Sequence, residues 1–221
     1  MQDALINING DQVQVLQILA LTTLISLLPS ILVMMTSFTR YIIVFSFLRS
    51  AMGTQQTPPN MVLVGMALFL TLFTMAPVFG EINTTAYEPY TAGEISQEEF
   101  LDRAEGPIKD FMLRQTETTS IHMYCDLADM SRPADGDAAM DLPMRVVIPA
   151  FMTSELKRAF EIGFFLYIPF MLIDIVVSAT LMSMGMIMLP PSMISMPFKL
   201  LLFITLNGWE LLFSTLVQGF R

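Results

Sequence analysis

Long apolar segments alternate with one polar stretch along this chain. Residues 13–35 are uncharged and mostly apolar, and residues 61–79 form a second apolar run after a polar turn at residues 53–60. A membrane-spanning helix needs about 20 mostly apolar residues, so each run is long enough to cross a bilayer. We therefore predict a first hydrophobic helical hairpin over residues 13–79, preceded by a short N-terminal segment at residues 1–12.

The few charges around this hairpin indicate its orientation. Asp3 and Asp11 precede the first run without any basic residue, which is the reverse of a secretory leader. The segment between Arg40 and Arg49 is too short to span a bilayer, so it either extends the first helix or lies against a partner. The excess of Lys and Arg in cytoplasmic loops predicts that Arg40 and Arg49 lie on the cytoplasmic side. The polar stretch that follows would then lie outside the cytoplasm.

That polar stretch is strongly acidic. Residues 80–145 hold 14 of the 20 acidic residues and 5 of the 11 basic ones, a net charge of −9, while the 6 acids and 6 bases elsewhere cancel. We predict an acidic, partly helical insert over residues 80–148. Ser96 and Glu99 have the spacing of a capping box that opens a helix. A break is expected at Gly106–Pro107.

After this break, helical spacing predicts one buried stripe made of Ile108, Phe111, Met112 and Gln115. Residues 130–141, MSRPADGDAAMD, are expected to form an exposed loop.

A second hydrophobic hairpin is predicted over residues 149–221. Its first helix is expected to begin at Pro149, with Thr153 or Ser154 as the N-cap. We expect it to run to residue 189, where Pro190 and Pro191 form the hairpin turn. The last helix is predicted over residues 198–218. Lys157 and Arg158, near the start of this hairpin, are expected to be offset by Glu155 and Glu161 at helical spacing.

Composition supports a membrane protein. The chain is 54% hydrophobic and 14% charged, whereas soluble domains carry about 25% charged residues. Such a composition also excludes a disordered chain, and the acidic balance argues against nucleic acid as a partner. The predicted fold class is an all-α membrane protein with two hydrophobic helical hairpins, separated by an acidic, partly helical extracytoplasmic insert.

No catalytic constellation is visible in the sequence. There is no nucleophile beside a base and no glycine-rich phosphate loop, so we expect no enzyme activity, no catalytic residue and no cofactor. His122 and Cys125 lack the further ligands that a metal site needs, and we interpret them as one helix face of the insert. Cys125 is the single cysteine, which excludes an intrachain disulfide.

Two carboxylates lie inside apolar sequence. Asp174 and Glu210 interrupt the second hairpin, and acids inside a membrane segment are costly and often functional. They either couple transport to protons or ions, or form hydrogen bonds between helices. We favour the structural role, because no intramembrane base is evident.

Methionine is unusually abundant near the second hairpin turn. The chain has 20 methionines, and six lie within residues 182–196. The first four are two residues apart, which does not give a single helical stripe. Ordinary packing, a thioether site for Cu(I) and a deformable hydrophobic plug are the alternatives. The six are Met182, Met184, Met186, Met188, Met193 and Met196.

Two long segments resemble a known family. Residues 28–73, beginning LPSILVMM, and residues 149–203, beginning PAFMTSELKRAFE, are similar to the two conserved blocks of the FliP family of flagellar type III export gate proteins. PIKDFMLRQTE at residues 107–117 and NGWELL at residues 207–212 are similar too. Virulence-secretion relatives share both blocks, but GTQQTPPN and LPP look more like the flagellar branch.

The resemblance implies a place in a larger assembly. Members of the family form a five-copy ring with FliQ-like and FliR-like subunits, next to other membrane proteins of the export apparatus. The ring lies in the flagellar basal body at the bacterial inner membrane, with the insert on the periplasmic side, and unfolded flagellar subunits pass through its centre. The family's constriction of three consecutive methionines maps onto Met186, Ile187 and Met188, where Ile187 departs from the pattern.

We therefore predict a core pore-forming subunit of the flagellar type III protein export gate, with a methionine-lined constriction. The main alternative is a small ion-coupled membrane transporter that uses Asp174 and Glu210. A methionine-based copper transporter is a third class. A transporter should act as a single purified species, whereas an export-gate subunit should copurify with other hydrophobic chains.

Overall fold

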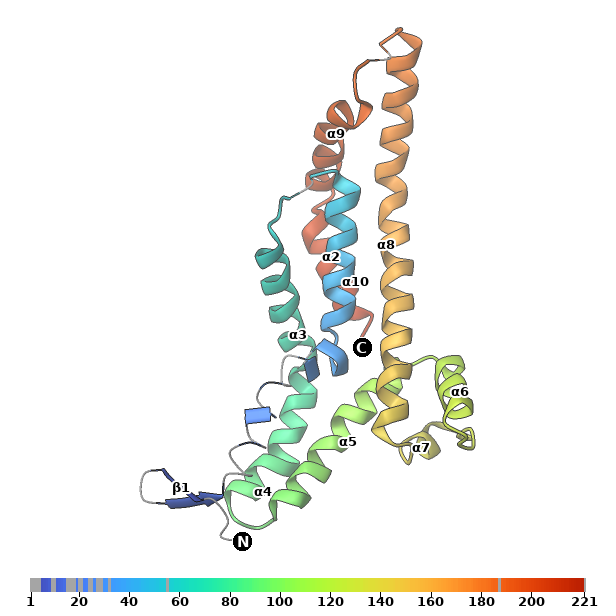
Figure 1. Cartoon of the computed structure of the whole chain (residues 1–221). Helices are drawn as coiled ribbons and strands as arrows, with labels where there is room; N and C mark the ends of the chain where they lie inside the picture. Colours follow the sequence, from blue (N-terminus) through green and yellow to red (C-terminus); the bar gives the residue numbers. More distant parts are fainter. Residues whose placement is uncertain are drawn as a thin grey trace.

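The protein is an elongated bundle of helices with a smaller helical unit at one end (Figure 1). Near the N-terminus, β1 (Leu5–Ile8) and β2 (Asp11–Gln14) form an antiparallel hairpin that pairs Leu5 with Gln14. The fold is otherwise helical within the part of the chain that the structure describes. This computed structural model describes residues 5–8, 11–14, 19, 22–23, 26, 30–31, 33–54, 56–186 and 188–220.

The first hairpin pairs α2 (Phe38–Met52) with α3 (Asn60–Ile82). The segment bracketed by Arg40 and Arg49 is therefore a helix in its own right, and α2 packs between α3 and α8. The predicted helix over residues 13–35 lies largely outside the described residues, and residues 13–14 belong to β2. The predicted apolar helix at residues 61–79 is confirmed as part of α3.

Helix α3 continues without interruption through η1 (Asn83–Tyr87) into α4 (Glu88–Thr91). The insert then folds back through α5 (Gln97–Gln115), α6 (Thr118–Leu127) and the single-turn α7 (Gly136–Ala139). The predicted exposed loop at residues 130–141 thus contains α7.

Ser96 is the N-cap of α5, and its side chain accepts a hydrogen bond from the Glu99 N–H at 3.2 Å, as predicted. The break predicted at Gly106–Pro107 is wrong, because α5 continues through both residues. Pro107 is buried there, so tertiary packing overrides its tendency to end a helix. The predicted stripe is confirmed for three of its four members: Phe111, Met112 and Gln115 are buried, Ile108 is partly buried, and Phe111 packs edge-on against Phe151 of α8.

The second hairpin begins with α8, a 40-residue helix from Met144 to Ser183. The predicted start at Pro149 is wrong, and so is the predicted N-cap at Thr153 or Ser154. Both hydroxyls lie inside the helix and donate to carbonyls one turn back, at 2.8 Å to Pro149 and 3.0 Å to Ala150. At a rise of 1.5 Å per residue, α8 is about 60 Å long, about twice the thickness of a bilayer core.

The return arm of this hairpin consists of α9 (Pro191–Thr205) and α10 (Gly208–Gln218), which are bent by 62° relative to each other. The single last helix predicted at residues 198–218 is therefore wrong in its start and in its continuity. Asn207 has a left-handed backbone, with φ of 49°, at the break.

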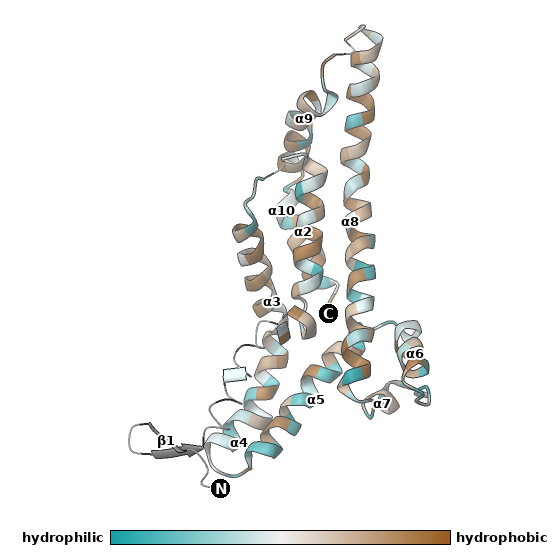
Figure 2. Ribbon diagram, viewed as in Figure 1, coloured by the Kyte–Doolittle hydropathy of each residue, from teal (hydrophilic) through white to brown (hydrophobic). Residues whose placement is uncertain are grey.

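The core follows one face of α2. Tyr41, Val44, Phe45 and Leu48 recur at helical spacing and are almost completely buried. Hydrophobic residues follow much of α3 and α8 (Figure 2), and many of their side chains are exposed. Among the described residues, the helix over Asn60–Thr91 and α8 are long and apolar enough to cross a membrane, and the bent pair α9 and α10 qualifies if it counts as one span.

Candidate functional site: a methionine-rich turn and two ion pairs

The turn between α8 and α9 lies at the end of the molecule farthest from the insert helices (Figure 1). Helix α8 ends at Ser183, and Gly185 adopts a left-handed backbone with φ of 75°. The N–H of Gly185 donates to the Met182 carbonyl at 3.0 Å, and that of Met186 to the Leu181 carbonyl at 2.9 Å. This pair of bonds is the Schellman motif, which ends helices at glycine.

Gly185 therefore ends α8, whereas Pro190 and Pro191 lie at the start of α9. We predicted that Pro190 and Pro191 would stop the first helix at residue 189, which is wrong. Pro190 is the N-cap of α9 and Pro191 is its first residue, where the missing N–H costs nothing. The two prolines thus form the second half of the hairpin turn.

The methionines of this turn face solvent in the single chain. Met188 is 97% exposed, and Met182, Met184, Met186 and Met193 are exposed as well. Ile187, the middle position of the predicted constriction, lies outside the described residues. Because α8 ends before Gly185, Met186 and Met188 are not on a helix. Their two-residue spacing therefore does not distribute the side chains around a helix axis.

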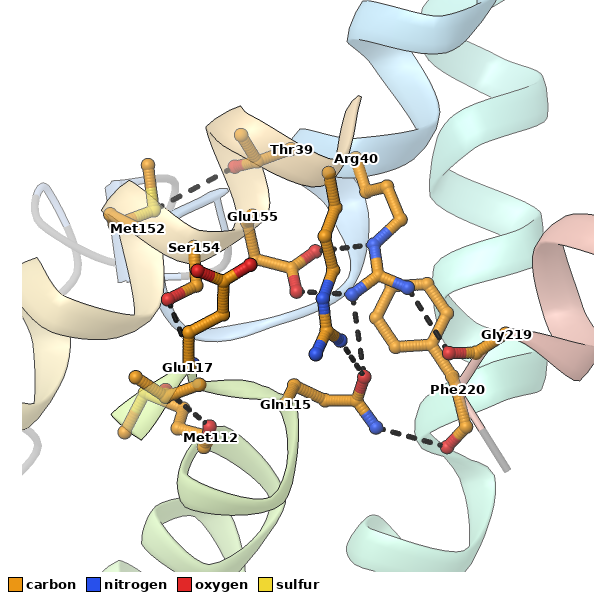
Figure 3. Close-up of polar contacts among 12 residues, drawn as sticks. Thr39, Arg40, Met112, Gln115, Glu117, Met152, Ser154, Glu155, Gly219 and Phe220 are labelled. Carbon is orange, nitrogen blue, oxygen red and sulfur yellow. Dashed lines mark hydrogen bonds and ion pairs between the residues drawn. The ribbon is translucent and has the colours of Figure 1, made fainter. Parts of the chain in front are cut away.

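A second feature is a buried cluster around Arg40, at the end of α2 that meets the insert (Figure 3). The guanidinium of Arg40 donates to both carboxylate oxygens of Glu155 on α8, through Nε at 2.8 Å and through Nη2. It also donates to the Gln115 side-chain oxygen at 3.3 Å and to the Gly219 carbonyl at 3.2 Å. Its planar face lies 3.7 Å from the centre of the Phe220 ring.

The Arg40 cluster joins four parts of the chain. Gln115 ends α5, donates to the Phe220 carbonyl at 3.3 Å and accepts from Arg158 at 3.0 Å. The side chains of Arg40 and Glu155 are only 3% and 0% exposed. Both hairpins, the insert and the C-terminal turn are therefore connected through one buried charge pair.

This arrangement differs from the pairing expected from sequence. Glu155 forms its ion pair with Arg40 across helices, and not with Lys157 or Arg158. Lys157 instead forms an ion pair with Glu117, which follows α5, at 2.8 Å. Because Arg40 lies inside α2 and its charge is neutralised, it does not belong to a solvent-facing loop. Arg40 therefore lies beside the insert, at the opposite end of α2 from Arg49, so the expectation that Arg40 and the insert lie on opposite sides of the membrane is not met.

Arg49 lies near the other end of α2, where it donates to the Pro58 carbonyl at 3.3 Å and to the Asn60 side chain at 2.5 Å. It therefore fastens the turn between α2 and α3.

A third feature surrounds Asp174, which sequence reasoning left without a base. Lys199 of α9 forms an ion pair with Asp174 of α8 at 2.7 Å and donates to the Ala51 carbonyl at 3.1 Å. Ser195 donates to the other Asp174 oxygen at 2.6 Å. Lys199 was the missed residue, although it is the only charge within residues 175–209. A base in such apolar sequence requires a partner.

Glu210 is placed differently. It lies in the first turn of α10 and is exposed, and its side chain makes no hydrogen bond or ion pair within the described part of the chain. The structure therefore does not bring Asp174 and Glu210 together as one site.

The insert contains no visible reaction centre. His122 and Cys125 lie on α6, as predicted, and burial raises the pKa of the Cys125 thiol, which disfavours the nucleophilic thiolate. No group of three or more His, Cys, Asp or Glu side chains that could hold a metal occurs among the described residues.

Comparison with known proteins places the chain in a family. The model of the FliP family matches residues 21–216. The chain is 49% identical to the flagellar biosynthetic protein FliP of Aquifex aeolicus (strain VF5), over 96% of this chain and 88% of that protein. It is also 49% identical to the proteins of the same name from Bacillus subtilis (strain 168), over 92% and 91% of the two chains, and from Pectobacterium carotovorum, over 96% and 82%.

The match covers both hydrophobic hairpins and the insert between them, and the structure has the long apolar helices expected of a membrane protein. This chain therefore belongs to the FliP family.

Proposed function

We propose that this protein is a pore-forming core subunit of the flagellar type III protein export gate and acts without catalysis. The relatives that it matches are flagellar biosynthetic proteins, and the match covers most of the length of each. The observation that carries the proposal is the exposed methionine turn, an apolar and adaptable surface that a lone soluble chain would not present. Several copies of this turn around an axis would form a constriction that passes unfolded flagellar subunits.

The constriction consists of Met186, Ile187 and Met188. An apolar ring closes a pore to ions by excluding water, while methionine side chains have many rotamers and adapt to different residues in transit. Ile187 is stiffer because it is β-branched, so most of the flexibility comes from its two neighbours.

The uncovered apolar surface supports an assembly with other chains. Phe69 and Phe73 on α3 and Phe164 and Phe165 on α8 are more than half exposed, and patches of this kind mark interfaces with protein or membrane. The partners we propose are further copies of the chain in a five-copy ring, FliQ-like and FliR-like subunits, other export-apparatus membrane proteins and lipid.

The assembly would lie in the bacterial inner membrane within the basal body, with the insert on the periplasmic side. The insert holds only 5 Lys and Arg in residues 80–145, which fits this side because these residues are enriched in cytoplasmic loops. The turn fastened by Arg49 would then face the cytoplasm.

Ion-coupled transport through Asp174 and Glu210 has weaker support. Asp174 is already neutralised by Lys199 and bound by Ser195, which supports a structural role. A copper site also has weak support, since residues 126–221 contain no His or Cys.

Photo-crosslinking during export tests the proposal. A photo-crosslinking amino acid at position 188 should capture a stalled, partly unfolded flagellar substrate. The same group at position 61, where Met61 is 86% exposed on α3, should capture lipid or neighbouring subunits only. Equal capture of substrate at both positions, or none at position 188 in an export-competent complex, would contradict the proposal.

A further inference from the structure

We propose that the turn methionines, Met182, Met184, Met186, Met188 and Met193, are an oxidation site at which hydrogen peroxide opens the closed pore. The modification itself follows from the exposure of these side chains. Its effect on the pore rests on the proposed function, in which the same turn forms the constriction.

Access separates these methionines from the buried methionines of the helix bundle. Met188 is 97% exposed, and the other four are between 45% and 69% exposed. Met75 and Met112 are fully buried, and Met52 is 3% exposed. In the single chain, an oxidant dissolved in water therefore reaches the turn directly, whereas it reaches the buried group only after the bundle opens. The buried methionines therefore serve as internal controls for the oxidation of the exposed ones.

The reaction is a two-electron oxidation of the thioether. A sulfur lone pair attacks one oxygen of hydrogen peroxide, the O–O bond breaks, and the displaced hydroxide takes the remaining proton and leaves as water. The sulfur gains an S=O bond, and the peroxide is reduced. Enzymes of the methionine sulfoxide reductase class reverse the change, so the modification is reversible.

The product changes the property on which closure depends. A sulfoxide is a polar hydrogen-bond acceptor, whereas the thioether is apolar and accepts only weakly. Residues 182–194 contain no charged side chain, so sulfoxide oxygens would become strong acceptors within the turn. They would hold water in a constriction that otherwise excludes it. Because each copy in a ring carries the turn, one modification per chain introduces several polar groups at one level.

Two measurements on the purified native complex test this proposal. Peptide mass analysis after peroxide treatment should show sulfoxide at the turn methionines about tenfold or more ahead of Met52, Met75 and Met112, because thioether oxidation follows exposure. Conductance in planar bilayers should rise on peroxide treatment and fall again after treatment with a methionine sulfoxide reductase.

Two variants make the conductance test specific. A variant with all five turn methionines replaced by leucine keeps an apolar turn of similar bulk and should remain closed in peroxide. Met61→Leu removes an exposed thioether on α3 and should leave the peroxide response unchanged. The complex carrying Met186→Ala and Met188→Ala serves as the open reference, because it lacks the bulk that closes the pore.

The outcomes separate the two proposals. Equal oxidation of exposed and buried methionines would overturn the oxidation site. Preferential oxidation with unchanged conductance, while the alanine reference leaks, would overturn the opening step and leave the proposed function intact. An alanine reference that stays closed would overturn the proposed constriction, and the opening step with it.

Discussion

Two of the buried basic residues that the structure describes, Arg40 and Lys199, have a carboxylate partner on another helix. Arg40 pairs with Glu155 and Lys199 pairs with Asp174, and both pairs join different helices. Buried ion pairs add little net stability relative to apolar residues, but removal of one partner leaves an uncompensated charge. The two pairs therefore specify which helices meet and in which register.

Glu155→Gln should destabilise the fold strongly. The amide keeps the size of the side chain but leaves the Arg40 charge uncompensated, in an environment where its side chain is 3% exposed. The expected loss is about 3–5 kcal/mol, read as a lowered midpoint temperature in detergent. The matched control is Glu99→Gln, which removes an exposed pair with Arg103 and should cost less than about 1 kcal/mol. Similar losses for both variants would show that burial of the Arg40 pair has no energetic effect.

Asp174→Asn should also lower stability, because Lys199 then loses its counter-charge while its side chain is 7% exposed. A second change, Lys199→Gln, should restore most of the loss, since the amides can replace the ion pair by a hydrogen bond. We expect this double variant to assemble and to export flagellar subunits. A double variant that assembles normally but exports nothing would support proton coupling through Asp174, against the structural role.

At the scale of elements, the sequence predicted the long described helices better than it predicted their ends, and it missed α7, which lies in a predicted loop. The Ser96 cap of α5 and its apolar stripe were predictable because both depend on residues close in sequence. Pro107 and Pro149 were misleading, because packing against distant helices keeps α5 and α8 continuous around them. The Arg40 cluster was not predictable, since the hydrogen-bond partners of Arg40 lie 75 to 179 residues away from it.

Gly163→Ala should loosen the contact between α2 and α8. A β-carbon at Gly163 would lie 2.5 Å from the Phe47 ring and 3.0 Å from the Phe47 β-carbon, so the two helices would have to separate. Overpacking of this kind costs about 1–3 kcal/mol, measurable as a lower unfolding midpoint. Gly65→Ala is the control, since a β-carbon there meets nothing within 4 Å and should be neutral or stabilising. A neutral result at Gly163 would contradict this close packing.

The connection from the insert to α8 should depend on pH. Lys157 donates to both Glu117 oxygens, at 3.0 and 2.8 Å, and this lowers the pKa of Glu117 below its ordinary value of 4.5. A lowered native pKa means that the pair stabilises the fold above pH 4.5 and that this contribution is lost as the pH falls through the native pKa. Near neutral pH, the wild type should therefore unfold at a higher temperature than the Glu117→Gln variant. This difference in midpoint temperature should vanish in acid.

Glu94→Gln provides the control for this pH series, because Glu94 is exposed and makes no ion pair among the described residues. Its difference from the wild type should stay small at every pH. A Glu117→Gln difference that persists in acid would exclude titration of Glu117 as the cause.

At the scale of the whole molecule, the single chain leaves many large apolar side chains exposed. Helix α8 exposes phenylalanine, leucine and valine along much of its length, and its length of about 60 Å exceeds a bilayer core. The Arg40 cluster fixes one end of the bundle, while the methionine turn lies exposed at the other (Figures 1 and 3). This asymmetry fits the proposed function, in which the Arg40 cluster fixes the helices near the insert and the methionine turn at the opposite end closes the pore.

The resting conductance of an assembled complex carrying Met186→Ala and Met188→Ala tests this account most directly. Both substitutions remove bulk from a turn in which Met188 is 97% exposed, and repetition around a ring multiplies the gap. Met61→Ala is the control, because it removes similar bulk from the exposed surface of α3. We predict that the double variant assembles like the wild type and conducts small ions in planar bilayers without substrate, while the control stays closed. An assembled double variant with the resting conductance of the wild type would contradict a seal formed by these methionines.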